Sequence, residues 1–298
     1  METEHTFGGA WTEEKLARLK GYLNRYRMVM KYQNFTTWYV DAFAGTGSRT
    51  DHARAASLEL FKDVYDDPDS DHYRQGSAAI ALSLEDPFER YLFIDRRKKH
   101  VKALQSSVSG SHPELLGRCV FEPGDANEVL RNWCAERNWY SERAVVFLDP
   151  YGMQVEWKTI ETLASTRGVD LWYLFPLGIG VSRLLTRDGE IDESWQQRLS
   201  RLFGTPDWRK RFYNTTIQSG LFGDMKQVER DAPAEKIQAF IEERLATCFL
   251  KVASGLILYN SRSNPLYSLC FAASNPNGAP IAMRIVRSIL ERDLPGRR

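Results

Sequence analysis

The sequence contains little cysteine and little histidine. Among its 298 residues there are four cysteines and five histidines. The cysteines are Cys119, Cys134, Cys248 and Cys270. They form no Cys-x-x-Cys pair and no Cys/His cluster with zinc spacing, so we expect no metal site. Because they lie within predicted strands or helices, reduced core thiols are favoured over disulfides or a nucleophile.

Net charge and long apolar runs are also nearly absent. The 40 lysines and arginines balance 39 aspartates and glutamates, and this near-neutral sum names no partner. No stretch approaches the roughly 20 apolar residues that cross a bilayer, and the opening METEHTFGG lacks the features of a signal peptide. We therefore expect a cytoplasmic protein without a membrane partner. The 43% of hydrophobic residues can fill a large core, which excludes a disordered, collagenous or coiled-coil chain.

Strand and helix patterns alternate along the first 180 residues. A helix is predicted from Trp11 to Tyr32, with Thr12 as its N-cap. The predicted strands span residues 36–43, 90–95, 118–122, 144–149 and 169–176, and helices are predicted at 78–84, 96–105, 128–138 and 157–165. Residues 49–75 form a polar excursion with one short helix at 55–65. Several strands are continuously apolar, as in a parallel sheet covered by helices on both faces.

The second part of the chain has a different order. Helices are predicted at 193–203, 207–213 and 234–247, followed by strands at 251–259 and 266–273 and a helix at 279–292. The six residues between these two strands are too few for a parallel crossover, so the strands form an antiparallel hairpin. Five strands joined by helices and then an antiparallel pair is the strand plan of class I methyltransferases.

The predicted fold class is therefore α/β, with a Rossmann-like, mostly parallel sheet of seven strands and an antiparallel hairpin at its edge. We expect one domain over residues 1–298. Its parts are a cofactor-binding core at 34–185, a helical insertion at 190–250, and the strand pair and last helix at 251–298.

A glycine loop follows the first predicted strand. Glycines at the carboxyl end of the first strand allow a tight turn where open α/β sheets bind ligands. The residues of this loop that we predict to bind a cofactor are Asp41, Ala42, Phe43, Gly45 and Gly47. A dinucleotide-binding pattern would place Gly or Ala where Thr50 stands. A nicotinamide oxidoreductase is accordingly the weaker alternative.

Acidic residues stand at the ends of the next two strands. Asp95 closes the second strand, where a carboxylate can accept hydrogen bonds from ribose hydroxyls. Asp125 and Ala126 follow the third strand, where the carboxylate could accept from an adenine amino group. Asp95 could instead cap the helix that follows it, and the two roles are compatible. For Asp125 the alternative is an isolated turn.

The fourth strand ends in Asp149-Pro150-Tyr151-Gly152. Amino-methyltransferases often carry Asp or Asn, then Pro-Pro and an aromatic residue at this place. The acidic or amide oxygen and a backbone carbonyl accept hydrogen bonds from the substrate amine, and the ring stacks on the base. We therefore predict Asp149, Pro150 and Tyr151 as catalytic residues, with a strand-terminating Asp-Pro turn as the alternative.

These segments resemble the three-Cys-motif partner proteins (TcmP), a bacterial and phage-associated family with a methyltransferase-like fold. The likeness spans most of the chain and includes the segments TEEKL, YVDAFAGTG, FLDPYG, FGTPDW and LYSLCFAASNPNG. It implies a three-Cys-motif protein as a partner. The cysteine motif belongs to that partner, so its absence here agrees with the resemblance.

The arrangement is more distantly similar to bacterial ribosomal-RNA adenine-N6 methyltransferases. By this resemblance Lys15 of the first helix and Ser77 at a helix start lie beside the cofactor. Two positions depart from that family, because Leu16 stands where it has histidine and the tetrapeptide is DPYG instead of DPPY.

The predicted function is S-adenosylmethionine-dependent N-methylation of a base amine in RNA or DNA. The alternative is a methyltransferase-fold protein that docks a three-Cys-motif partner with little or no catalysis. The basic run from Arg96 to His100 could contact phosphates, although a solvated helix face is the simpler interpretation.

Overall fold

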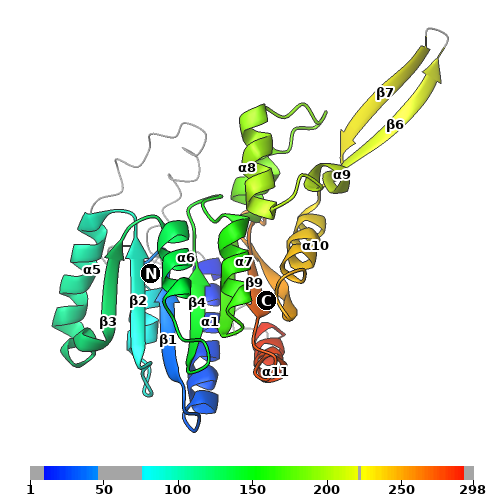
Figure 1. Ribbon diagram of the computed structural model, residues 1–298. Helices are drawn as coiled ribbons and strands as arrows, with labels where there is room; N and C mark the ends of the chain where they lie inside the picture. Colours follow the sequence, from blue (N-terminus) through cyan, green and yellow to red (C-terminus); the bar gives the residue numbers. More distant parts are fainter. Residues whose placement is uncertain (1–9, 46–75, 221–222, 292–298) are drawn as a thin grey trace, which may run out of the picture.

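The computed structural model describes residues 10–45, 76–220 and 223–291, and it contains a seven-stranded sheet (Figure 1). The strand order is β3-β2-β1-β4-β5-β9-β8. The bounds are β1 (Thr36–Asp41), β2 (Arg90–Asp95), β3 (Cys119–Pro123), β4 (Glu142–Leu148), β5 (Val169–Phe175), β8 (Lys251–Tyr259) and β9 (Pro265–Ala273). The first five strands pair in parallel, and β9 pairs antiparallel with both β5 and β8. This is the predicted Rossmann-like sheet of class I methyltransferases, with its antiparallel hairpin at one edge.

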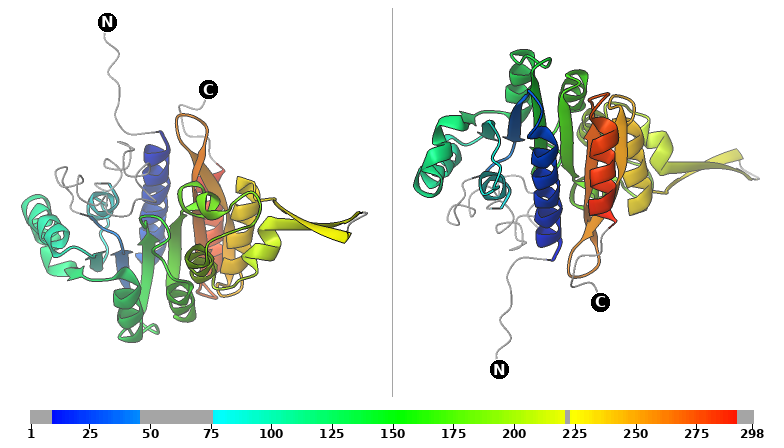
Figure 2. Two further views of the ribbon diagram at one scale, coloured as in Figure 1. Left: turned by 90° about the horizontal axis from the view of Figure 1, so that it is seen from above. Right: turned by 90° about the horizontal axis from the view of Figure 1, so that it is seen from below.

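Helices cover both faces of this sheet (Figure 2). Their bounds are α1 (Ala10–Met30), α4 (Ser77–Leu82), α5 (Lys98–Ser111), η4 (Pro113–Arg118), α6 (Ala126–Ala135), α7 (Trp157–Ser165) and α11 (Ala279–Leu290). Successive strand residues point to opposite faces. Val40 and Val146 therefore pack in one core with α6 and α7, whereas Tyr39 and Val145 pack in the other with α1 and α11. The strands are apolar throughout because each is buried on both sides.

An insertion follows β5. It contains the π-helical turn η5 (Leu177–Ser182), α8 (Glu193–Phe203), α9 (Trp208–Phe212), β6 (Tyr213–Gly220), β7 (Gly223–Arg230) and α10 (Ala234–Leu245). Phe203 of α8 packs the insertion against the sheet. The centre of its ring lies 5.7 Å from the ring centre of Phe175 in β5 and 5.0 Å from that of Phe240 in α10. Gly204 ends α8 in the left-handed conformation (φ 68°), where a Cβ would lie 2.0 Å from the ring of Trp157.

The β6–β7 hairpin was not predicted from the sequence. It forms a sheet of its own that projects from the body of the protein (Figure 1). Its residues are mostly polar on both faces, so hydrophobic alternation, the usual signal of a strand, is missing. The predicted helix at 207–213 ends one residue earlier, because Tyr213 begins β6.

Several smaller predictions can be compared with the structure. Thr12 is not the N-cap of the first helix, because α1 begins at Ala10 and Thr12 is buried within it. The four cysteines form no disulfide, and burial raises the pKa of the Cys270 thiol to about 12. The predicted short helix at 55–65 lies outside the described residues. In the described part of the chain, none of the helices combines the length and the apolar character needed to span a membrane.

Candidate functional site

The predicted site residues gather at one edge of the sheet. Because β1, β2 and β4 are parallel, their carboxyl ends lie together, and Asp41, Asp95 and Asp149 stand at or directly after those ends. The chain leaves β1 toward β2 and later returns to place β4 on the other side of β1. This is the topological switch point, where open α/β sheets bind ligands.

Asp41 is fully buried at the end of β1. Its Oδ2 accepts a hydrogen bond from the Ser77 hydroxyl at 2.6 Å, and its Oδ1 accepts from the backbone N–H of Phe43 at 3.2 Å. The pKa of the Asp41 carboxyl is raised to about 6. Burial is the main cause, the hydrogen bond from Ser77 opposes it, and the nearby Asp149 charge adds a smaller upward contribution. Ser77 is the first residue of α4, so this bond fixes the start of that helix against β1.

Lys15 reaches the same place from α1. Its Nζ lies 3.1 Å from Oδ2 of Asp149 and 5.3 Å from the ring centre of Phe147. The Lys15 side chain is 0% exposed and that of Asp149 is 9% exposed. The Lys15 charge also lowers the pKa of Asp41. We call Lys15, Asp41, Ser77 and Asp149 the edge cluster; it joins residues separated by up to 134 positions in the sequence.

The glycine loop lies against the end of β2. The backbone N–H of Gly45 donates to Asp95 Oδ2 at 3.1 Å, and Gly45 has a φ of 66°, which glycine adopts without strain. Asp95 Oδ1 accepts from the N–H of Arg97 at 2.8 Å and lies 3.1 Å from Nδ1 of His100. Asp95 therefore connects the loop to the start of α5. Gly47, also predicted to bind a cofactor, lies outside the described residues.

Asp125 is the N-cap of α6, a role that was not predicted from the sequence. Its Oδ1 accepts from the backbone N–H groups of Asn127 at 2.9 Å and Glu128 at 3.4 Å. The preceding Gly124 N–H donates to the carbonyl of Asp95 at 3.1 Å, which places the third strand end next to the second. Ala126, the other residue predicted here, is buried at the start of α6.

Asn127 was missed by sequence reasoning. This residue is 7% exposed; its Nδ2 donates to the carbonyl of Gln154 at 2.9 Å, and its Oδ1 accepts from the N–H of Glu156 at 2.9 Å. The side chain thus ties α6 to the loop that follows Asp149. A buried amide must find such partners, but the sequence contains no signal for which loop would supply them.

The Asp149-Pro150-Tyr151-Gly152 segment leaves the sheet in a turn. Pro150 is buried, Tyr151 is half-buried, and the Tyr151 N–H donates to Gln154 Oε1 at 3.2 Å. Gly152 has a φ of 61°, so the residue at the usual aromatic position is a glycine in the left-handed conformation. Of the other predicted loop residues, Ala42 is buried and its N–H donates to the carbonyl of Phe147 at 3.2 Å, while Phe43 is half-buried. Which of these residues contact a cofactor or substrate stays a prediction.

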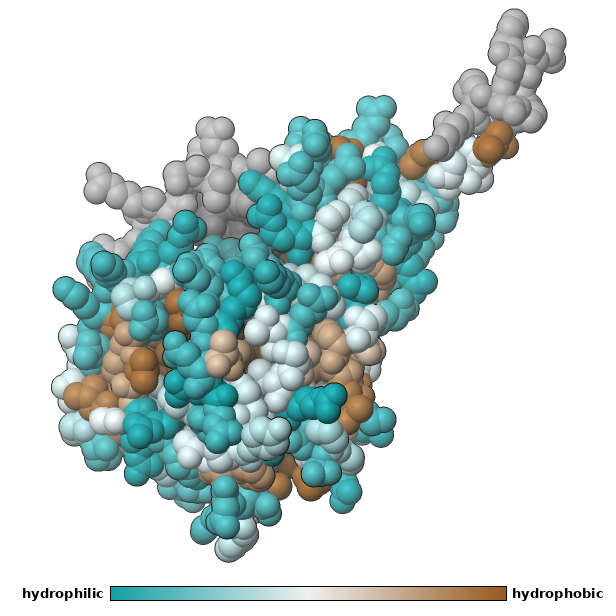
Figure 3. All heavy atoms as spheres, viewed as in Figure 1, coloured by the Kyte–Doolittle hydropathy of each residue, from teal (hydrophilic) through white to brown (hydrophobic). Residues whose placement is uncertain are grey.

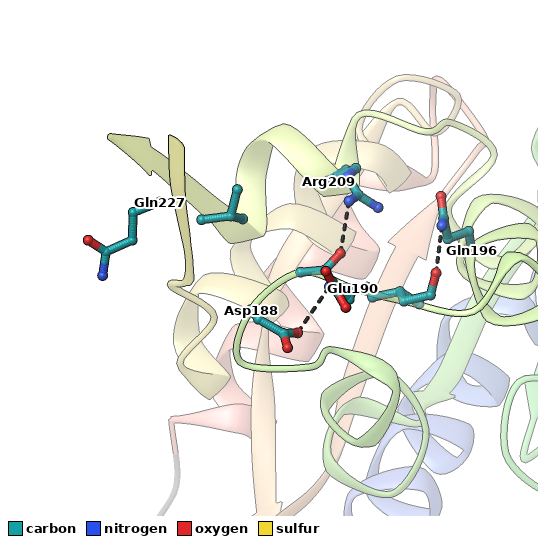
Figure 4. Close-up of a pocket in the computed structure, with 8 residues that line it drawn as sticks. Asp188, Glu190, Gln196, Arg209 and Gln227 are labelled. Carbon is teal, nitrogen blue, oxygen red and sulfur yellow. Dashed lines mark hydrogen bonds between the residues drawn. The ribbon is translucent and has the colours of Figure 1, made fainter. Parts of the chain in front are cut away.

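A hollow of about 490 Å³ lies at a different place, at the base of the β6–β7 hairpin (Figure 4). Its lining includes Asp188, Glu190, Gln196, Arg209 and Gln227. It contains none of the residues predicted to bind a cofactor. The carboxylates of Asp188 and Glu190 and the guanidinium of Arg209, all exposed, give the hollow groups of both charge signs.

Comparisons with known proteins give matches among solved structures. The Legionella pneumophila protein LPL1258 is 10% identical over 98% of this chain and 95% of that chain, with a TM-score of 0.44. Spermidine synthase from Thermotoga maritima is 10% identical over 98% and 74%, with a TM-score of 0.40. An O-methyltransferase from Bacillus cereus in complex with SAH is 11% identical over 71% and 80%, with a TM-score of 0.34. No protein-family model and no curated protein sequence matches this chain.

Proposed function

We propose that this protein is an S-adenosylmethionine-dependent methyltransferase that methylates an amino nitrogen of a nucleic-acid base. The observation that carries the proposal is the buried ion pair between Lys15 and Asp149 at the switch point of a class I methyltransferase sheet. Asp149 is the residue directly before Pro150. The strand order of the sheet is observed in the structure. We infer the reaction and the cofactor from the polar groups along the carboxyl edge of that sheet.

The polar groups at this edge suit a cofactor that contains adenosine and a cationic sulfonium. Asp95 and Asp125 carry carboxylates that can accept from ribose hydroxyls and an adenine amino group. We assign Ser77 and the backbone of residues 42–45 to binding the methionine end of the cofactor. The edge cluster holds two carboxylates and one ammonium, so its ionised form has an excess negative charge that attracts a cation.

In the proposed reaction the bound cofactor supplies an electrophilic methyl group. Asp149 and the Pro150 carbonyl accept hydrogen bonds from the acceptor amine and aim its lone pair, and Tyr151 lies next to them to contact the base. The Lys15 ammonium, 3.1 Å from Asp149 Oδ2, holds the orientation of that carboxyl group. Positioning supplies most of the rate, so no covalent enzyme intermediate is required.

The test uses Asp149→Ala, which removes the side-chain oxygens that would accept from the acceptor amine. We expect calorimetry to show that the variant still binds S-adenosylmethionine, while tritium transfer to fractionated cellular RNA and DNA falls by at least about 10²-fold, the scale of one lost positioning group. Asp188→Asn, which changes an exposed carboxylate away from the edge cluster, is the control and should transfer at the wild-type rate. Equal transfer by the Asp149 variant would contradict the proposed role.

A second candidate is a docking protein with little catalysis of its own, the role implied by the resemblance to three-Cys-motif partners. The observation in its favour is Gly152, which leaves the usual position of the base-stacking ring without a side chain. It predicts that Asp149→Ala leaves the biological activity unchanged. A three-Cys-motif partner, the single-domain organisation and the cytoplasmic location stay predictions.

A further inference from the structure

The insertion after β5 carries a second feature of the same sheet edge. We call residues 193–220 and 223–230, which comprise α8, α9 and the strands β6 and β7, the arm. Because β5 is parallel to β4, the chain enters the insertion at the carboxyl edge, where the edge cluster lies. Figure 1 shows α8 above this edge and the hairpin extending outward from α9.

The hairpin is a regular two-stranded ribbon. All eight residue pairs, from Tyr213↔Arg230 to Gly220↔Gly223, follow one antiparallel register. At about 3.4 Å per residue, eight residues give a ribbon of about 27 Å. Neither strand pairs with the main sheet, so the outer edges and at least one face of the ribbon are open to a partner.

The two faces of the ribbon differ at its base. Thr215 and Val228 are directly opposite one another and therefore share a face of the ribbon. Tyr213 lies on the same face because it is two residues from Thr215 on β6. This face packs on the body: the Tyr213 hydroxyl donates to the Thr186 carbonyl at 2.9 Å, and a Cβ on Gly189 would lie 2.8 Å from Val228 Cγ1.

The other face carries hydrogen-bonding side chains. Thr216 lies opposite Gln227, and Asn214 lies opposite Glu229; all four are exposed. Figure 4 shows the Gln227 side chain directed away from Asp188 and Glu190. The Asn214 amide also donates to Asp231 at 3.2 Å, which leaves Thr216 and Gln227 as the pair best placed to meet a partner.

The helices at the base of the ribbon are basic. Residues 193–213, which contain α8 and α9, hold five basic and two acidic residues, a net charge of 5 − 2 = +3 in a protein whose whole net charge is +1. Arg201 is exposed, and the Lys210 side chain is 88% exposed. Figure 3 shows hydrophilic side chains over α8 in the view of Figure 1. Where the structure describes side chains of the arm, at 193–217 and 227–230, Ile217 is the one large apolar side chain that is exposed. Protein interfaces are instead rich in aromatic residues and methionine.

We propose that the arm binds duplex DNA, with the ribbon in the major groove and α8 and α9 on the flanking phosphates. The major groove of B-form DNA, about 12 Å wide, admits a two-stranded ribbon. Gln and Thr side chains hydrogen-bond to base edges there, and basic side chains neutralise phosphates. The major groove of A-form RNA is too deep and narrow for side chains to read. The inference rests on the proposed function and names its substrate as duplex DNA.

The experiment measures DNA binding without any cofactor, so it is independent of methyl transfer. Fluorescence anisotropy would compare the full chain on a 20-base-pair DNA duplex, an RNA duplex of the same sequence, and the single DNA strand. We expect the DNA duplex to bind at least about tenfold more tightly than the RNA duplex. Because each phosphate contact contributes about 0.9 to the salt slope, Arg201→Glu with Lys210→Glu should lower the slope by about 2. Thr216→Ala with Gln227→Ala should reduce the preference among DNA sequences and leave the slope unchanged.

Lys20→Glu, on an exposed part of α1, is the matched control and should bind like the wild type; melting curves confirm that each variant is folded. Equal affinity for the RNA and DNA duplexes, or wild-type affinity for DNA in the arm variants, would overturn the proposal. Calorimetry with S-adenosylmethionine separates the two ideas: cofactor binding without DNA binding contradicts the arm proposal, and DNA binding without cofactor binding contradicts the proposed function.

Discussion

The edge cluster and the arm carry their charges in opposite ways. In the edge cluster the charged groups of Lys15, Asp41 and Asp149 are buried or nearly buried and come from distant parts of the chain. In the arm the basic residues are close in sequence and mostly exposed, and the Lys210–Asp207 pair spans only three positions. A buried charge that loses its partner is strongly destabilising, whereas an exposed charge contributes little to stability.

This difference indicates a division of labour. Side chains that must hold a fixed geometry are buried and are positioned by the whole fold, which suits a chemical site. Side chains on the arm have water around them and can adapt to a partner. Substitutions in the edge cluster should therefore change stability and activity together, and substitutions in the arm should change binding alone.

The largest effect is expected from Lys15→Met. The variant leaves the carboxyl groups of Asp41 and Asp149 buried without an ammonium, which should lower the free energy of unfolding by about 3–5 kcal/mol and abolish methyl transfer. Urea unfolding measures the first and tritium transfer the second. Adding Asp149→Asn to Lys15→Met should restore part of the stability, because one unpaired charge is removed. Additive losses in the double variant would contradict the coupling.

A buried carboxylate outside the edge cluster sharpens the comparison through pH. Burial raises the pKa of Asp170 to about 6, although the hydrogen bond from the Tyr22 hydroxyl at 2.6 Å and the charge of Arg143 lower it. Between about pH 4 and pH 6 the folded chain holds a proton that the unfolded chain has lost. Unfolding free energy should therefore fall as pH rises through this window, by about 3 kcal/mol for a shift of two pKa units.

Asp170→Asn tests this dependence. Urea unfolding at pH 4 and pH 6.5 should show a smaller fall in the variant than in the wild type, and the difference isolates Asp170 from Asp41, whose pKa is also raised to about 6. Glu190→Gln, an exposed carboxylate, should unfold with the wild-type pH dependence. Identical curves for wild type and Asp170→Asn would show that this carboxyl does not set the slope.

Ser77→Ala should have an intermediate effect. It removes the hydroxyl that donates to the buried Asp41 carboxylate, and a hydrogen bond to a charged group contributes about 1.5–3 kcal/mol. The pKa of Asp41 should rise further, because the Ser77 hydrogen bond now lowers it. Thermal melting at pH 5 and pH 8 measures both effects, since the loss should be larger at pH 8, where Asp41 is ionised. Ser83→Ala, which changes an exposed serine at the other end of the same helix, is the control.

The smallest effect on stability is expected in the arm. Lys210→Ala removes an exposed ammonium 3.5 Å from Asp207, and such surface pairs contribute little to stability because water screens both charges. Its melting temperature should match that of the wild type within about 2 °C. A larger fall would mean that the arm is part of the structural core.

The sheet could be predicted from the sequence because its strands follow strong rules. Continuous apolar segments such as Ala144–Asp149 and the short connection before Leu266 predicted parallel strands and the final hairpin, and both are confirmed. The β6–β7 ribbon could not be predicted in this way. It forms a separate two-stranded sheet, and its sequence carries no alternating hydrophobic pattern that would mark the strands.

The candidate site could be predicted in part. Strand ends marked Asp41, Asp95 and Asp149, because every parallel strand delivers its last residue to the same edge. Lys15 was assigned to the site only through a family resemblance. Its contact with Asp149 was not predicted, since no local pattern links residues 134 positions apart. Asn127 was missed for the same reason: its partners, Gln154 and Glu156, lie in a loop whose position is set by the packed sheet.

The central claim is that the carboxyl edge around Lys15, Asp41 and Asp149 binds S-adenosylmethionine. Isothermal titration calorimetry of the purified full chain tests it most directly. We expect saturable one-to-one binding of S-adenosylmethionine that is weakened at least tenfold by Asp95→Ala and unchanged by Lys210→Ala. No heat of binding for S-adenosylmethionine or S-adenosylhomocysteine at millimolar ligand, with stabilisation by NADH instead, would contradict the claim.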